Sequence, residues 1–229
     1  MKRLRWRADL VLSLAGGLVL AAFGLRQAVA SFLLMPAAAT LQSLQEMKPV
    51  EPAALDGLIA DQTASLAVAP NAAGWSNLSL ALALRQQDAA AESALLTSLS
   101  LAPANPYGWL RLAVLRDAAN APETDVLAAW RLSQWTGPNE VRLRQLRIRL
   151  AVAHWSGLAE ADRRSLFMDI RHEWDHDQSS VFALATTPIA TNIIRAALVI
   201  DMDAFTTFEH QMAAREVNHQ DTKASSGKK

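Results

Sequence analysis

Three stretches of the chain align with one another: PNAAGWSNLSLAL (70–82), NPYGWLRLAVL (105–115) and NEVRLRQLRIRL (139–150). Asn71, Asn105 and Asn139 are each 34 residues apart. The same spacing separates the positions that follow them: Trp75, Trp109 and Leu143, then Leu78, Leu112 and Leu146. A period of 34 residues indicates units of two antiparallel helices, each of which buries its apolar face by stacking on its neighbours. Ala and Leu outnumber Val, Ile and Thr, and only 9 Gly and 9 Pro are present, so composition also predicts an all-α fold.

This period resembles that of tetratricopeptide repeats. Within 71–104, the positions that match the Trp, first Leu, middle Ala, Phe and terminal Pro of that pattern are Trp75, Leu78, Ala91, Leu95 and Pro103. The chain departs from the pattern at its Gly, which is replaced by Ser79, Ala113 and Arg147. The resemblance implies an α-solenoid of antiparallel helix pairs, with units at about 37–70, 71–104, 105–138 and 139–172.

Residues 173–215 are expected to form helices that cap the array, because the terminal apolar face of a solenoid must be covered. Pro188 opens a helix with Ile189, Ile193 and Ala197 in register. Asp203 is expected to cap a further helix, which carries Phe205, Phe208 and Met212. The polar remainder, 216–229, is expected to be a disordered tail.

Residues 1–35 are expected to form a membrane anchor, in which four basic residues precede an apolar run from Leu10 to Leu25. Basic residues at this end favour a cytoplasmic N-terminus and place the repeats outside the cytoplasm. The run can continue to Met35 if Arg26 and Gln27 lie at the outer interface. Alternatively, Ala28-Val29-Ala30 is an A-x-A site and the segment is a signal cleaved after Ala30. Small residues at Ser13, Gly17 and Ala21 would allow two anchors to pack as a homo-oligomer.

The bulk composition excludes several classes of function. Lys+Arg and Asp+Glu balance at 22 each, so the net charge is zero and nucleic acid is not an expected partner. The chain has no Cys, which removes disulfides, thiolate metal sites and cysteine nucleophiles. No cofactor is expected.

One short motif suggests catalysis. HEWDH (172–176) has the H-E-x-x-H spacing in which two His on successive helical turns hold Zn²⁺ and the Glu activates a water molecule. On a helix over 160–177, however, Trp174 shares an apolar face with Leu166, Phe167 and Ile170, while His172 and His176 lie opposite. No third ligand follows in a recognisable motif, so we expect a polar helix face and no catalytic or metal site.

Two surface features remain. In VRLRQLRIRL (141–150), Leu143, Leu146 and Leu150 share a stripe, and the arginines are expected to extend from a buried helix toward water. The first helix of each repeat of a tetratricopeptide array lines its concave groove, which the resemblance projects onto eight mostly apolar residues. An exposed apolar patch of this kind indicates a protein-binding site, unless the C-terminal helices of the chain itself fill it. The groove residues are Leu80, Tyr107, Leu110, Val114, Asp117, Val141, Arg144 and Ile148.

The anchor, the repeats and the ending NIIRAALVIDMDAFTTFEHQM (192–212) resemble bacterial anchored repeat proteins associated with exopolysaccharide or other envelope-polysaccharide assembly. The resemblance implies a non-enzymatic scaffold that binds protein partners through the groove and assigns no catalytic residues. Two alternatives stay open: a permanent accessory subunit of a larger membrane complex, and a zinc metallopeptidase that uses HEWDH.

Overall fold

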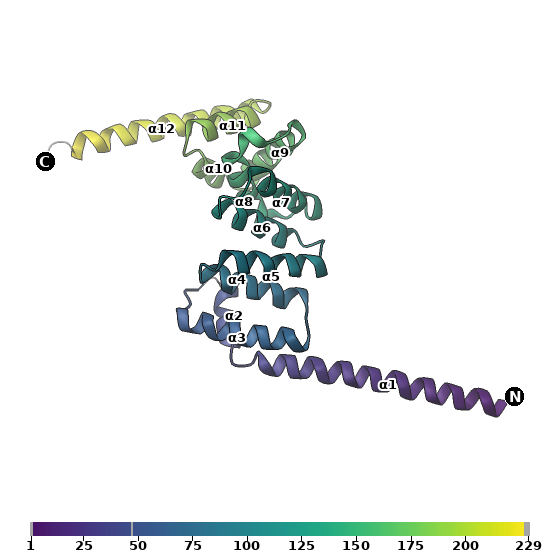
Figure 1. Ribbon diagram of the computed structural model, residues 1–229. Helices are drawn as coiled ribbons and strands as arrows, with labels where there is room; N and C mark the ends of the chain where they lie inside the picture. The colour runs from purple at the N-terminus through teal and green to yellow at the C-terminus, as the bar shows by residue number, and fades with distance from the viewer. Residues whose placement is uncertain (1, 47, 227–229) are drawn as a thin grey trace. The chain divides into compact units, whose positions relative to one another are not determined.

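A computed structural model describes residues 2–46 and 48–226, with side chains for 13–44, 46 and 48–215. Every regular element in these residues is helical, which confirms the all-α prediction (Figure 1). The chain divides into two compact units, 1–108 and 109–229.

The first helix, α1 (Lys2–Leu33), is long and apolar. Its segment Ser13–Leu33 has 21 residues and a mean hydropathy of 1.5, so one helix near the N-terminus has the length and composition to cross a membrane. The side chains of residues 2–12, which include the basic residues of the expected cytoplasmic end, lie outside the described residues.

In the described part of the first unit, α1 and α2 pack against α3, α3 against α4, and α4 against α5. The core around α3 contains Leu55, Leu58, Ala37 and Ala81, with Ile59 packed against it. Leu66 of α3 is also buried. The helices of this unit after α1 are α2 (Ala38–Gln45), α3 (Pro52–Val68), α4 (Ala72–Leu84) and α5 (Asp88–Leu101).

Two asparagines 34 residues apart cap the helices that follow them in the same way. The Asn71 Oδ1 accepts a hydrogen bond from the Gly74 amide at 2.7 Å, and the Asn105 Oδ1 accepts one from the Gly108 amide at 3.2 Å. Such bonds satisfy amides that have no partner within the first turn of a helix. Asn139 does not continue the series, because Glu140 is the N-cap of α8 and makes no side-chain cap bond.

The two glycines in these caps also share a packing role. A Cβ on Gly74 would lie 2.7 Å from Cδ2 of Leu66, and one on Gly108 would lie 2.8 Å from Cδ2 of Leu99. Glycine at these positions therefore lets the start of a helix approach the end of the preceding helix closely.

Within its described residues, the second unit contains six complete α-helices and most of α6, and its core forms where α8, α10 and α11 pack against α9. Its largest buried side chains include Trp130, Ile148, Ile170 and Phe208. Phe208 meets the ring of Trp174 edge-on, with 6.1 Å between ring centroids. The elements are α6 (Pro106–Ala118), α7 (Glu123–Thr136), α8 (Val141–Ala153), the 3₁₀ turn η1 (Trp155–Gly157), α9 (Glu160–His176), α10 (Gln178–Leu184), α11 (Pro188–Leu198) and α12 (Met202–Ser226).

The helices α3, α5, α7 and α9 end in the same manner. In each, the C-cap residue has φ between −137° and −156° and ψ between 69° and 93°. Its amide donates to the carbonyl oxygen four residues earlier, which belongs to Ser65, Ser98, Ser133 or Glu173. All four of these residues are buried. The steps between them are 33, 35 and 40 residues, so this shared geometry is not visible as one fixed sequence period.

The C-terminal expectations need correction. Pro188 does open α11, and Ile193 and Ala197 are buried, but Ile189 is exposed because Ala190 and Ile194 occupy the inward positions. The cap of α12 is Asp201, whose carboxylate accepts from the amides of residues 203 and 204, and not Asp203. The backbone is helical as far as Ser226, where a disordered tail was expected; residues 227–229 and the side chains beyond 215 lie outside the described residues.

Candidate functional site

The expected groove residues do not form one class of surface. In the first unit, Leu80 is half-buried and Tyr107 is exposed. In the second, Val141 is exposed, Val114 is half-buried, and Asp117 is exposed with its carboxylate 2.8 Å from Nε2 of His154. Leu110 and Ile148 are fully buried, so the prediction that they line an open groove is wrong. These two side chains contribute to the core and offer no surface to a partner.

Arg144 was also expected in the groove, but it turns inward. Its Nη1 lies 3.5 Å from Oε2 of Glu173 and donates to the carbonyl oxygen of His172 at 3.3 Å. Both charged side chains of this ion pair are largely buried. The Arg144 guanidinium therefore connects α8 to α9 within the second unit.

Arg147 is the clearest departure from the expectation that arginines of α8 extend toward water. It is 1% exposed. Its Nη1 donates to the carbonyl oxygen of Gly137 at 2.9 Å, and its Nη2 donates to that of Ser133 at 2.5 Å. The Ser133 hydroxyl is 3.0 Å from its Nε. This guanidinium fixes the end of α7 against α8, and in the same helix Leu146 is exposed although it was expected to be buried.

Asp169 of α9 is a further buried charged residue. Its Oδ2 accepts a hydrogen bond from Nε2 of Gln134 at 2.6 Å. Burial raises the pKa of the Asp169 carboxyl above its ordinary value, while the Gln134 hydrogen bond and the charges of Arg147, Arg144 and His172 act in the opposite direction. Polar and charged side chains thus join α7, α8 and α9 internally.

The HEWDH motif divides between two environments. Trp174 is buried, and His172 and His176 are exposed, as the helical projection predicts. Glu173 was not expected in the core, but it is buried and its Oε1 accepts from the Ser180 hydroxyl at 2.8 Å. In a metallopeptidase the glutamate must reach a water molecule held beside the two histidines. In α9 the carboxylate instead contacts interior groups.

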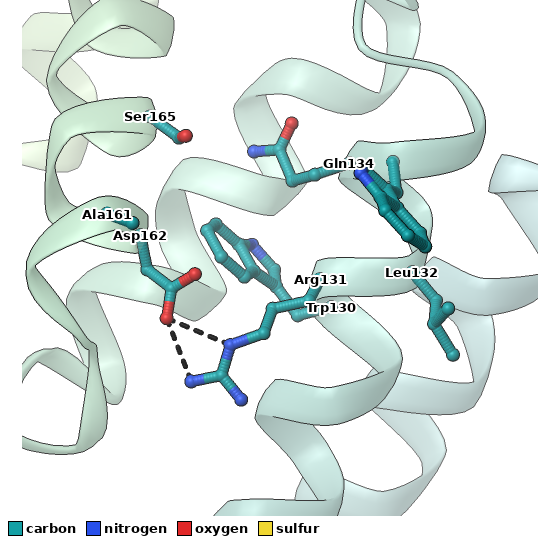
Figure 2. Close-up of a pocket in the computed structure, with 8 residues that line it drawn as sticks. Trp130, Arg131, Leu132, Gln134, Ala161, Asp162 and Ser165 are labelled. Atoms are coloured by element: carbon teal, nitrogen blue, oxygen red, sulfur yellow. Dashed lines mark hydrogen bonds and ion pairs between the residues drawn. The ribbon is translucent and has the colours of Figure 1, made fainter.

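A cavity of about 440 Å³ opens on the same unit, between α7 and α9 (Figure 2). Its apolar lining includes Trp130 and Leu132, and the Nε1 of Trp130 donates to the carbonyl oxygen of Arg147 at 3.1 Å. Trp135, in the last turn of α7, also lines the cavity and is 86% exposed. A tryptophan this accessible beside a cavity leaves a large apolar surface in water.

The polar side of the cavity carries one ion pair, drawn with dashed lines in Figure 2. The Nε and Nη2 atoms of Arg131 lie 2.9 and 2.8 Å from Oδ2 of Asp162. The same oxygen accepts from the amide of Ala159 at 3.2 Å. Ser165 completes this side. The arrangement offers a volume of ligand-pocket size with an apolar wall and one fixed pair of charges.

Sequence reasoning missed Trp135, although a signal for it exists. The buried residues of α7 are Val126, Leu127, Ala129, Trp130 and Ser133, which define one face of the helix. At 100° per residue, Trp135 lies about 140° away from Trp130 and thus off that face. An aromatic residue at such a position indicates an exposed ring.

No group of three or more His, Asp or Glu side chains within the described part of the chain is placed to hold a metal ion. Comparison with known proteins adds no assignment. No protein-family model matches the chain, and no curated protein is significantly similar to it.

Proposed function

We propose that the protein is a non-enzymatic, membrane-anchored scaffold built from tetratricopeptide-like helix pairs, which binds a protein partner. The helix bounds support the repeat: the first helices of successive pairs begin at Ala38, Ala72, Pro106 and Val141, in steps of 34, 34 and 35 residues. The equivalent caps of Asn71 and Asn105 and the shared ends of α3, α5, α7 and α9 support it independently. A stack of such units presents extended surfaces suited to binding.

The anchor in this proposal is α1, retained in the mature protein. Ala30, at the end of the A-x-A sequence, is buried, and the helix continues past it to Leu33. Cleavage after Ala30 would remove a packed residue from the first unit. The basic residues before Leu10 favour a cytoplasmic N-terminus, which places the helix pairs outside the cytoplasm.

The observation that carries the binding function is Trp135 beside the cavity between α7 and α9. Interface energy is concentrated in a few residues, among which Trp and Arg are enriched, and these anchors sit in or beside pockets. Trp135, the cavity and the Arg131–Asp162 pair supply this combination on one face. The partner surface therefore lies on α7 and α9, and Leu110 and Ile148 of the groove first expected have no part in it.

Affinity purification of the full-length protein in mild detergent tests this function. We expect one partner to co-purify in a fixed ratio with the wild type and with Arg164→Ala, since Arg164 is an exposed residue of α9 outside the cavity lining. Trp135→Ala should weaken binding by about 2 kcal/mol, or about 30-fold in Kd. Recovery of the same partner in the same ratio with Trp135→Ala would remove the basis for the proposed site.

The resemblance of the anchor, the repeats and the C-terminal ending suggests the setting, which is assembly of exopolysaccharide or another envelope polysaccharide at the outer face of the cytoplasmic membrane. In this setting the scaffold recruits a protein of the assembly system. Deletion of the gene should then reduce export of the polymer without changing synthesis of its precursors, as radiolabelled sugar incorporation would show.

A second candidate, a permanent accessory subunit of a membrane complex, is favoured by exposed apolar side chains in the first turn of α11, between α11 and α12, and at the start of α12. These are Ile189, Val199, Ile200 and Met202. A subunit whose apolar face is always covered should aggregate when purified alone and be stabilised by its complex. A scaffold that recruits its partner reversibly should stay monodisperse in detergent without it.

A further inference from the structure

The surroundings of α1 change at Arg26. Before it, the described apolar side chains are exposed; after it, the helix packs against α3, and Ala30 and Ala37 are buried. A helix end that belongs to a folded unit is not a free linker. The exposed apolar side chains before Arg26 are Leu14, Leu18, Val19, Leu20, Phe23 and Leu25.

Arg26 joins the two helices directly, because its Nε donates to the carbonyl oxygen of Val68. Val68 is the last residue of α3, where carbonyl groups lack partners within the helix and the helix dipole is negative. A guanidinium at this point satisfies one carbonyl and complements the dipole. The C-terminal end of α3 is therefore held beside Arg26.

Beyond Arg26, α1 also keeps an apolar surface that α3 does not cover. Val29 and Phe32 lie in the last turns of the helix and Met35 in the turn that follows, with exposures of 42%, 70% and 68%. We call these three residues the outer stripe. It continues the exposed apolar surface of the preceding segment along the chain.

The length of α1 places the outer stripe at a definite height in a bilayer. The hydrocarbon core is about 30 Å thick, which corresponds to about 20 residues at 1.5 Å per residue. If the core begins at Leu10, the first residue of the apolar run, its outer edge falls near Ala30. The headgroup layer adds about 5 to 7 Å on that side, or about four residues, and so contains Phe32 and extends nearly to Met35.

The same count places Arg26 at a depth in the bilayer where its charge can still reach the membrane surface. It lies about 6 Å inside the outer edge, a distance that an arginine side chain spans while its stem remains in an apolar environment. The guanidinium then reaches the end of α3 at the membrane surface.

We propose that the outer stripe lies in the lipid headgroup layer of the outer leaflet, so that α1 seats the α3 end of the first unit directly on the membrane. The occupant of the stripe is lipid, because the stripe continues the segment proposed to span the membrane and falls within the thickness of the bilayer. This inference rests on the proposed anchoring by α1. It adds that no flexible linker separates the first unit from the membrane.

Single cysteines test it cleanly, because the natural chain contains none. The probe is a water-soluble maleimide, applied to full-length protein in nanodiscs of phosphatidylethanolamine and phosphatidylglycerol that hold one chain each. Both membrane faces are then accessible, and a second copy cannot cover the stripe. The variants are Leu20→Cys in the span, Phe32→Cys and Met35→Cys in the stripe, and Ala64→Cys as an exposed control on α3. Labelling in SDS normalises the intrinsic reactivity of each thiol.

We expect Phe32→Cys and Met35→Cys to react at least about tenfold more slowly than Ala64→Cys, with Leu20→Cys slower still. If Leu20→Cys is protected while either stripe position reacts as fast as Ala64→Cys, the seating on the membrane is wrong and the anchoring stands. If Leu20→Cys reacts as fast as Ala64→Cys, the anchoring fails and the inference fails with it. The native side chains at 20, 32, 35 and 64 are exposed, so none of these substitutions removes a core contact.

Discussion

Two glycines of the first unit should respond to the same substitution with opposite signs. A methyl group on Gly74 would lie 2.7 Å from Cδ2 of Leu66 and 2.8 Å from Nε2 of Gln62, and both of these side chains are buried. Overpacking of this kind costs about 1 to 3 kcal/mol, against a gain in helix propensity of at most about 1 kcal/mol. We therefore expect Gly74→Ala to lower the free energy of unfolding by about 1 to 2 kcal/mol.

Gly57→Ala is the matched control. Gly57 lies within α3, and a Cβ there would meet no heavy atom within 4 Å. Alanine should raise the free energy of unfolding by about 0.5 to 1 kcal/mol, because it restricts the unfolded chain and favours the helix. Urea unfolding of both full-length variants in mild detergent, followed by far-UV circular dichroism, measures the difference. If both substitutions stabilise the protein equally, the close approach of α4 to α3 at Gly74 is refuted.

Three further predictions concern the helix cap at Asn71 and the buried side chains of Arg147 and Asp169. Asn71→Ala should lower the free energy of unfolding by about 1 kcal/mol, because its cap bond is lost, whereas Asn139→Ala should leave it nearly unchanged. Equal effects of the two substitutions in urea unfolding would contradict the cap assignments. Arg147→Met should lower the free energy of unfolding by about 2 to 4 kcal/mol, because charge-assisted hydrogen bonds to two carbonyls are lost. The exposed control Arg149→Met should change it by no more than about 0.5 kcal/mol. If Arg147→Met leaves the free energy of unfolding unchanged, the buried guanidinium is not needed for stability. Because burial raises the pKa of Asp169 from 3.8, the folded state holds this proton to higher pH than the unfolded chain does, so stability falls as pH rises between the two pKa values. In urea midpoints measured over a series of pH values, Asp169→Asn should remove this part of the pH dependence. If the pH dependence of the midpoints is the same in the variant, Asp169 is not its source.

The all-α class and the buried face of α9 could be predicted from the sequence. The helical projection of 160–177 placed Leu166, Ile170 and Trp174 in the core and both histidines of HEWDH outside it, and the burial of these residues agrees. An apolar N-terminal helix of membrane-spanning length is also present. These features depend on side-chain spacing along single helices, which the sequence carries locally.

The polar interior could not be predicted in this way. Arg147 is buried because Ser133 in α7 and Gly137 just after it bring two backbone carbonyls and a hydroxyl to its guanidinium, and backbone groups leave no trace in side-chain patterns. Glu173 is buried because Ser180, on the next helix, donates to it. Charged residues in an alternating pattern were assigned to the surface by the usual rule, which fails where such partners exist.

The prediction of the groove residues failed for a related reason. Leu110 and Ile148 were assigned to an open surface by projecting a family rule onto helices whose rotation had not been established. Their burial shows that the rule does not transfer residue by residue. The exposure of Trp135 could have been predicted from the sequence, because its position on α7 separates it from the buried face of that helix.

We propose that this chain holds a protein partner against the face formed by α7 and α9. Site-specific photo-crosslinking in intact membranes tests it most directly, with a photoreactive amino acid placed at Trp135 or, as a control, at Arg164 on the exposed side of α9. We expect one discrete adduct of constant mass from position 135 that is absent from position 164. No adduct at position 135, or the same adducts from both positions, would contradict it.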